Sequence, residues 1–346
     1  MNFRNLTINE IKDIVVSFGE KPYRGEQIFT WLHKNMVLSL DEMTNVSKNL
    51  REKLQNNFEV DFPKIEKEYI SKIDDTKKYL IKLGDGYNIE SVLMKYKYGY
   101  TVCVSSEIGC NMGCKFCAST VKGMIRNLEP YELLAQIYLI EKHNNIKISN
   151  IVIMGMGEPL LNFDNVLKFI ELINSPYGQN ISMRNITIST CGIVENIYKL
   201  ATYKLPVTLA LSLHAPNDKI RQEIMPIAKK YDLHSVMSAM ADYYKETNRK
   251  ITFEYTLIGE INCSKELAYE LVKLFDKELR SKNVDFNVNL IQVNEIKESN
   301  LKRPSIEKVK SFQNILERAG ISVLLRRELG KDISGSCGQL RLSESR

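Results

Sequence analysis

The feature that most constrains the fold is a regular alternation of strand-like and helix-like segments that begins after Tyr100. Longer stretches with helical periodicity, such as residues 131–141 behind Pro130, separate the short apolar runs. Six such runs occur, at residues 101–105, 150–154, 185–189, 207–212, 251–257 and 285–291, and residues 321–326 add a possible edge strand. This alternation predicts an α/β fold in which six (β/α) units form a parallel sheet curled into a partial barrel.

Two segments of different character precede the alternating part. Residues 1–60 show helical periodicity and predict a small accessory domain, either a packing module or a module that docks RNA. Residues 61–99 alternate apolar and polar side chains around Gly84-Asp85-Gly86, which predicts a hairpin in a β-rich linker. Residues 100–346 are then expected to hold the barrel and a carboxyl-terminal segment.

Composition narrows the class of protein. A net charge of +6 and a pI near 8.7 are compatible with an RNA partner, although many basic enzymes never bind nucleic acid. The absence of a long apolar run and of a signal peptide predicts a cytoplasmic chain with no membrane partner. In such a chain seven cysteines indicate metal binding or thiol chemistry rather than structural disulfides.

The most specific motif is a C-x3-C-x2-C run directly after the first strand of the predicted barrel. It consists of Cys110, Cys114 and Cys117, called the loop cysteines below. Ligands of parallel α/β sheets sit at the carboxyl ends of the strands, which is where this run falls. Three thiolates can hold three irons of a cubane cluster and leave the fourth iron open. A structural zinc site would need a fourth protein ligand, and no such partner is apparent nearby.

With Phe116 before its last cysteine, the run resembles the signature of the radical-SAM superfamily. In that superfamily the open iron chelates S-adenosylmethionine (SAM), and electron transfer cleaves SAM to a 5′-deoxyadenosyl radical. Further segments make the chain similar, over nearly its whole length, to the RlmN/Cfr group of RNA adenine methyltransferases. They are Gly155-Met156-Gly157-Glu158-Pro159-Leu160, Ser189-Thr190-Cys191-Gly192, Ser212-Leu213-His214-Ala215-Pro216-Asn217 and Cys337-Gly338-Gln339-Leu340.

The resemblance implies one [4Fe-4S] cluster on the loop cysteines and two molecules of SAM per catalytic cycle. It implies SAM contacts from Gly157, Glu158, Ser189, Ser212, Leu213, His214 and Asn294. The chain departs from the group at the last of these, because it reads Val293-Asn294-Glu295 where the group usually has Trp-Asn-Pro.

The resemblance also implies three catalytic residues. Cys337 would carry the methyl group on its sulfur, and Cys103 would release the methylated base by forming a disulfide with Cys337. Glu90 would accept the hydrogen of adenine carbon 2 as a proton. Without the resemblance, Cys103 is more typical of a small buried hydrophobic residue in a strand. Cys191 and Cys263 are expected to be structural.

The expected function is methylation of carbon 2 of an adenosine in the peptidyl-transferase region of 23S rRNA, and of an anticodon-adjacent adenosine in some tRNAs. A flavodoxin or ferredoxin would donate electrons to a monomeric enzyme, and basic residues would contact the RNA backbone, with Lys21, Arg24, Arg326 and Arg327 as candidates. Three alternatives are a Cfr-type carbon-8 methyltransferase, a radical-SAM glycyl-radical activase and a non-enzymatic RNA-binding module that is stabilised by a bound metal. Pro159 favours carbon 2, since the Cfr pattern has alanine there.

Overall fold

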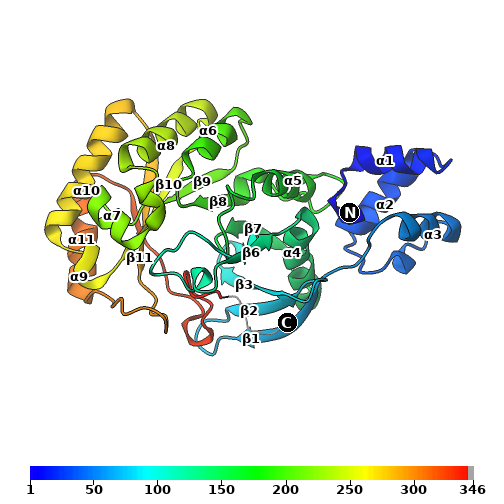
Figure 1. Ribbon diagram of the computed structural model, residues 1–346, viewed down its shortest axis with the longest axis horizontal. Helices are drawn as coiled ribbons and strands as arrows, with labels where there is room; N and C mark the ends of the chain where they lie inside the picture. The colour runs from blue at the N-terminus through cyan, green and yellow to red at the C-terminus, as the bar shows by residue number, and fades with distance from the viewer. Residues whose placement is uncertain (342–346) are drawn as a thin grey trace.

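The computed structural model describes residues 1–341, and a ten-stranded sheet is its central element (Figure 1). The strands lie in the order β1-β2-β3-β4-β7-β8-β9-β10-β11-β12. From β4 onward all neighbours are parallel. These strands are β4 (Gly99–Val104), β7 (Ile148–Ile153), β8 (Ile186–Thr190), β9 (Thr208–Ser212), β10 (Ile251–Leu257), β11 (Phe286–Gln292) and β12 (Val323–Leu325).

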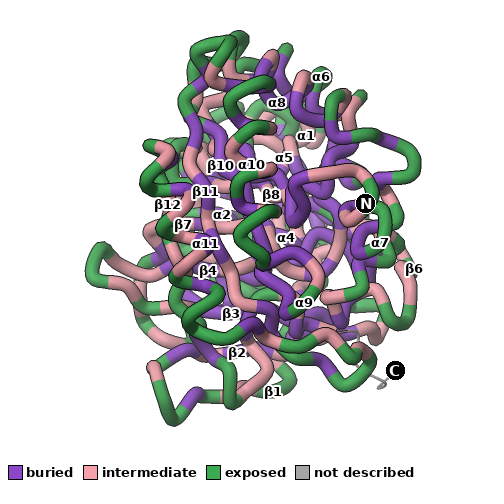
Figure 2. Tube along the Cα trace, turned by 90° about the vertical axis from the view of Figure 1, so that its left-hand side faces the viewer, coloured by how far each residue is buried: buried purple, intermediate pink, exposed green. Residues whose placement is uncertain are grey.

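The predicted (β/α) alternation and the edge strand are both confirmed. Helices follow the parallel strands and cover the outside of the curved sheet, while β10 is buried along its whole length (Figures 1 and 2). Such double covering explains why the strands read as continuous apolar runs. The helices are α4 (Pro130–Asn144), α5 (Phe163–Asn174), α6 (Val194–Thr202), α7 (Asp218–Ile224), α8 (Leu233–Thr247), α9 (Gly259–Asn262), α10 (Lys265–Glu278) and α11 (Ile306–Arg318).

The segment expected to be a linker extends the same sheet. Strands β1 (Lys64–Ile70), β2 (Lys77–Lys82) and β3 (Asn88–Tyr96) pair antiparallel, and β3 pairs antiparallel with β4. The predicted hairpin turn lies between β2 and β3. Most of β3 is buried, because it lies between two strands of the sheet. The antiparallel extension and the parallel barrel therefore share one hydrogen-bonded sheet.

A separate two-stranded sheet supports the loop cysteines. Strands β5 (Glu107–Gly109) and β6 (Met124–Asn127) pair antiparallel, and the loop between them holds all three thiols. The Cys110 N–H donates to the carbonyl oxygen of Gly123 at 3.0 Å, which closes the base of the loop. The cysteines thus lie on a closed loop with two fixed ends.

Three helices form the amino-terminal part, α1 (Ile8–Ser17), α2 (Tyr23–His33) and α3 (Lys48–Asn57). The N-cap of α1 is a capping box in which Thr7 and Glu10 exchange side-chain and backbone hydrogen bonds. The helices stand to one side of the barrel, beyond α4 and α5 (Figure 1). His33 of α2 meets the Tyr138 hydroxyl of α4 at 3.0 Å, which ties the two parts together.

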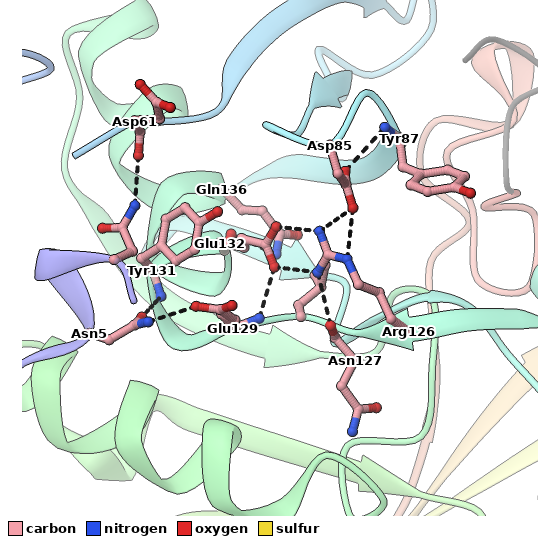
Figure 3. A network of polar contacts seen from close by, with 12 residues as sticks. Asn5, Asp61, Asp85, Tyr87, Arg126, Asn127, Glu129, Tyr131, Glu132 and Gln136 are labelled. Carbon is pink, nitrogen blue, oxygen red and sulfur yellow. Dashed lines mark hydrogen bonds and ion pairs between the residues drawn. The ribbon is translucent and has the colours of Figure 1, made fainter. Parts of the chain in front are cut away.

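A polar network joins the cysteine-bearing sheet to α4 (Figure 3). Arg126 of β6 donates to both carboxylate oxygens of Glu132 at 2.7 Å and to Asp85 of the β2–β3 turn at 2.8 Å. Asn5 extends the network to the amino-terminal part, because its side chain donates to Glu129 at 2.7 Å. One arginine therefore fixes the far strand of the cysteine loop to two other elements.

No helix among residues 1–341 is long and apolar enough to cross a bilayer.

Candidate active site

A cavity of about 230 Å³ opens inside the barrel at the carboxyl ends of its strands. Six of the seven cysteines line it, namely Cys103, Cys110, Cys114, Cys117, Cys191 and Cys337. Cys263 instead belongs to the hydrophobic core, as expected for a structural cysteine. A cavity with this many thiols is suited to soft metals and to thiol chemistry.

The loop cysteines all line this cavity. Burial raises the pKa of Cys110 to about 12 and that of Cys114 well above its usual range, and in both cases the Cys117 thiol adds to the effect. The ring of Phe116 meets the imidazole of His214 edge-on, with centroids 4.7 Å apart. The aromatic side chain therefore covers the loop on the side of His214.

The donor set fits an iron–sulfur cluster. Three thiols on one buried loop are the ligands such clusters use, and bound iron would supply the positive charge that these thiols need to ionise. Within residues 1–341 no group of three cysteine, histidine, aspartate or glutamate side chains stands at metal-binding positions. Cys110, Cys114 and Cys117 are the residues that would hold the cluster.

The carboxyl-terminal loop, residues 334–340, is bonded directly to the cysteine loop. The Ala118 N–H donates to the Gly338 carbonyl oxygen at 2.7 Å, and the Ser119 hydroxyl donates to the Leu340 carbonyl oxygen at 2.6 Å. A Cβ at position 338 would lie 2.8 Å from the Phe116 carbonyl oxygen, so only glycine allows this close approach. These contacts hold Cys337 at the cavity.

Cys103 and Cys337 meet different surroundings in the cavity wall. Cys103 lies within β4, and burial raises its pKa to about 12, with a further contribution from the Cys337 thiol. Cys337 is open to solvent through the cavity, yet desolvation by the surrounding wall raises its pKa to about 11, against the opposing effect of the Arg326 cation. The two thiols are close enough to influence each other electrostatically.

Glu158 is the most constrained of the predicted SAM contacts. Its two carboxylate oxygens accept the Cys191 N–H at 2.7 Å and the Leu160 N–H at 3.0 Å, and burial raises its pKa. Gly157, Ser189, Ser212, His214 and Asn294 line the same cavity.

His214 and Asn294 carry further contacts. The Thr256 N–H donates to Nδ1 of His214 at 2.9 Å, so the neutral ring carries its proton on Nε2, and burial lowers its pKa to about 3. The Asn294 amide donates to the Cys337 carbonyl oxygen at 2.9 Å. Despite its altered sequence neighbours, Asn294 therefore reaches the cavity and helps to hold the carboxyl-terminal loop.

Two predicted site residues lie outside the cavity wall. Leu213 is fully buried, and its carbonyl oxygen accepts a hydrogen bond from Arg221. Glu90 of β3 is also buried, with one oxygen 3.0 Å from the Lys78 ammonium and the other accepting the Arg341 N–H at 2.9 Å. Glu90 thus contacts the backbone of Arg341, the residue that follows the carboxyl-terminal loop.

Sequence reasoning missed three residues of the cavity wall. Cys191 lines it and, through its backbone, holds Glu158. Arg326, a candidate for contact with the RNA backbone, lines the cavity, with its guanidinium 3.6 Å from the carboxylate of Glu254. Glu254 is inside the fully buried strand β10, and a charged residue in an apolar run was the available signal.

Comparisons with known proteins agree with this geometry. Residues 1–60 match the family model described as the ribosomal RNA large subunit methyltransferase N-terminal domain, and residues 108–272 match the radical SAM superfamily. The crystal structure of a radical SAM methyltransferase from Sphaerobacter thermophilus superposes with a TM-score of 0.92 at 36% identity, covering 98% of this chain and 99% of that one.

Two relatives of similar length carry the same name. A probable dual-specificity RNA methyltransferase RlmN from Clostridium novyi is 49% identical over 98% of this chain and 97% of its own length. A protein of the same name from Lachnospira eligens is 47% identical over 98% of this chain and 95% of its own. Identity at this level over the whole chain, together with the cysteine-lined barrel, means that the chain belongs to the RlmN family of radical-SAM RNA methyltransferases.

Proposed function

We propose that this chain methylates carbon 2 of an adenosine in the peptidyl-transferase region of 23S rRNA, and of an anticodon-adjacent adenosine in some tRNAs. One observation carries the proposal: Cys337, distant in sequence, lines the same cavity as Cys103 and the loop cysteines. Carbon 2 of adenine is electrophilic and has no acidic hydrogen, so direct transfer of a methyl cation cannot reach it. A protein-bound methyl carrier solves this problem, and a paired second thiol allows its release.

The loop cysteines would hold one [4Fe-4S] cluster, and the cavity residues Gly157, Glu158, Ser189, Ser212, His214 and Asn294 would hold SAM beside it. When bound, cluster and SAM supply a carbon-centred radical. The carboxylate of Glu158 is suited to a cationic amino group, because an ammonium and a carboxylate form charge-assisted hydrogen bonds. Leu213 would contribute only through the backbone, since its side chain faces the core.

The two remaining thiols would then act in sequence. Cys337 loses its proton, and its sulfur takes a methyl group from a first SAM. A second SAM would supply the radical that removes a hydrogen atom from this methyl group. The carbon of the former methyl group would then bond to adenine carbon 2. The adduct would return one electron to the oxidised cluster, which balances the electron that starts the cycle, and the carbon 2 hydrogen would leave as a proton to Glu90. Cys103 attacks the Cys337 sulfur, the S–S bond forms as the S–C bond breaks, and a proton completes the methyl group.

Glu90 is the proposed acceptor of the carbon 2 proton. A buried carboxylate on β3 suits this role chemically. One of its oxygens accepts the Arg341 N–H, so Glu90 can reach a base in the cavity only after that bond opens.

The remaining assignments follow from the family. We propose a flavodoxin or ferredoxin as electron donor, action as a monomer, and a cytoplasmic location. We also propose residues 1–60 as the RNA-docking domain, residues 61–99 as the β-rich extension, and residues 100–346 as the catalytic domain with the carrier segment.

Nucleoside mass spectrometry tests the function directly. Anaerobically reconstituted protein, given SAM, a reductant and an rRNA fragment that contains the target adenosine, should produce 2-methyladenosine. Cys337→Ala should abolish the product, whereas Cys263→Ala, a cysteine in the core, should retain it. Methylation at carbon 8, or turnover by Cys337→Ala, would overturn the proposal.

A further inference from the structure

The tip of the β3–β4 hairpin carries aromatic and basic residues in alternation, Lys95-Tyr96-Lys97-Tyr98-Gly99-Tyr100. The rings of Tyr96 and Tyr98 are stacked nearly parallel, with centroids 5.0 Å apart and planes 6° apart. Tyr96 lines the active-site cavity, while Tyr98 is 67% exposed. The stacked pair therefore leads from the cavity wall to the molecular surface.

The hairpin fixes this pair in place. Tyr96 pairs with Gly99 across the turn, and Gly99 has a positive φ of 124°. A Cβ at position 99 would lie 2.2 Å from the Ser149 hydroxyl oxygen, so the turn packs closely against the start of β7. The Tyr96 hydroxyl donates to the Met94 sulfur at 3.7 Å. An aromatic surface held this way loses little conformational entropy when a ligand stacks on it.

Positive charge surrounds the pair. Lys95 and Lys97 are exposed on either side of Tyr96. Arg326 and Arg327 line the same cavity as Tyr96. Exposed aromatic rings interleaved with cations are the surface that unpaired nucleotides recognise, through base stacking and phosphate contacts.

We propose that the Tyr96–Tyr98 pair is a stacking platform for an unpaired RNA base that neighbours the target adenosine, with Lys95 and Lys97 contacting the flanking phosphates. The inference rests on the proposed function, since it requires RNA at the cavity. A target base that leaves its stack to enter the cavity costs its neighbour a stacking partner. The exposed ring of Tyr98 replaces that partner and lowers the cost of extracting the base.

RNA affinity of the reconstituted enzyme tests the platform. The probe is a fluorescein-labelled RNA stem-loop with an unpaired adenosine in its loop, and binding is followed by anisotropy. Tyr98→Ala and Tyr98→Leu should weaken binding by on the order of fivefold to a hundredfold, the range expected for one base–aromatic stack. Tyr98→Trp should retain affinity because it keeps an aromatic face. Tyr269→Ala, which removes a 58% exposed tyrosine from α10, should match wild type.

Salt dependence separates stacking from charge. Tyr98→Ala should leave the slope of log affinity against log salt unchanged, whereas Lys97→Ala should reduce it by about one, because one phosphate contact is lost. Tyr98→Ala affinity within about twofold of wild type, or equal losses in Tyr98→Trp and Tyr98→Ala, would overturn the platform.

Methyl loading distinguishes failure of the platform from failure of the function. Intact-mass measurement of wild type and Tyr98→Ala, each incubated with SAM, should show one methyl group on Cys337 in both. A wild type that neither loads nor binds the RNA would contradict the proposed function. Normal loading in both, with equal RNA affinity, would contradict the platform alone.

Discussion

Cys103 and Cys337 carry the same functional group, but the fold gives them different freedom. Cys103 is fixed within β4, opposite Val92 on one neighbouring strand and Val152 on the other. Cys337 lies in a loop and is exposed to the cavity. A carrier must bring its methyl group first to the cofactor and then to the base, whereas a resolving thiol needs only a fixed position beside it. The placement matches the order of the proposed steps.

This difference predicts distinct failures of the two cysteines. Cys103→Ala should still load the methyl group and bond to carbon 2, but no thiol is present to release the base. RNA should therefore remain covalently attached to the protein as a slow band on a denaturing gel, sensitive to nuclease. Cys263→Ala should turn over without such a band. Normal methylation by Cys103→Ala, with no adduct, would return Cys103 to the role of a buried strand residue.

At the residue scale, the sequence predicted which cysteines would lie together in one cavity, but it did not predict the contact between Arg326 and Glu254. The loop cysteines and Cys337 stand in local motifs, so their partners were predictable from spacing and resemblance. The contact between Arg326 and Glu254 depends on the curvature of a sheet that brings β10 and the end of β12 together. No local pattern encodes such a contact, so the position of Arg326 in the cavity wall could not be predicted from the sequence.

At the scale of elements, α2 docks on α4 through a buried histidine. His33 is fully buried and contacts Tyr138, and burial lowers its pKa to about 3. The neutral ring can occupy this apolar position, but the imidazolium cannot without losing its solvation. The attachment of the amino-terminal helices therefore depends on protonation.

The pH dependence of stability tests this contact. The pKa of His33 is lower in the folded chain than its ordinary value, so the unfolded chain takes up the proton first. The free energy of unfolding should therefore fall as the pH drops below about 6.5. Between about pH 7.5 and about pH 5.5, His33→Gln should lose about 1.4 kcal/mol less than wild type in urea unfolding. His143→Gln changes a half-exposed histidine of α4, and its stability should fall with pH as that of wild type does. If His33→Gln lost as much unfolding free energy as wild type over this pH range, the explanation would be contradicted.

Elements were predictable where their periodicity is local. All six barrel strands were predicted because each is an apolar run between helical segments. The role of residues 61–99 was predicted less well, since alternation identifies a strand but does not name its pairing partner. Only the pairing of β3 with β4 shows that the predicted linker is part of the barrel sheet.

At the scale of the whole molecule, the Arg126 network holds three parts of the chain together. Glu132 is 1% exposed and forms two hydrogen bonds with Arg126, which also binds Asp85 (Figure 3). Loss of the Glu132 charge would leave Arg126, whose side chain is 34% exposed, with Asp85 as its remaining ion-pair partner in this network. The network also anchors β6, and with it one end of the cysteine loop.

Glu132→Gln should therefore destabilise the fold by about 1–2 kcal/mol in denaturant unfolding, because the bonds between Arg126 and a buried carboxylate weaken while Arg126 keeps Asp85. Glutamine can still serve as the third residue of the capping box, so the loss reports the ion pair rather than the start of α4. Glu223→Gln, the same change at an exposed position of α7, should cost less than about 0.5 kcal/mol. Equal effects of the two substitutions would rule out a special contribution from Arg126.

The bond between Ser119 and Leu340 has a consequence for how the enzyme is assembled. It joins residues 221 positions apart, so it closes one of the longest loops in the chain. Long-range contacts form late, because the entropy of loop closure must be overcome before they stabilise anything. Barrel strands and cysteine loop can therefore reach their native arrangement while Cys337 is still absent from the cavity. Metal insertion has an open route during that interval, and the arrival of the carboxyl-terminal loop then completes a wall over a cluster already in place.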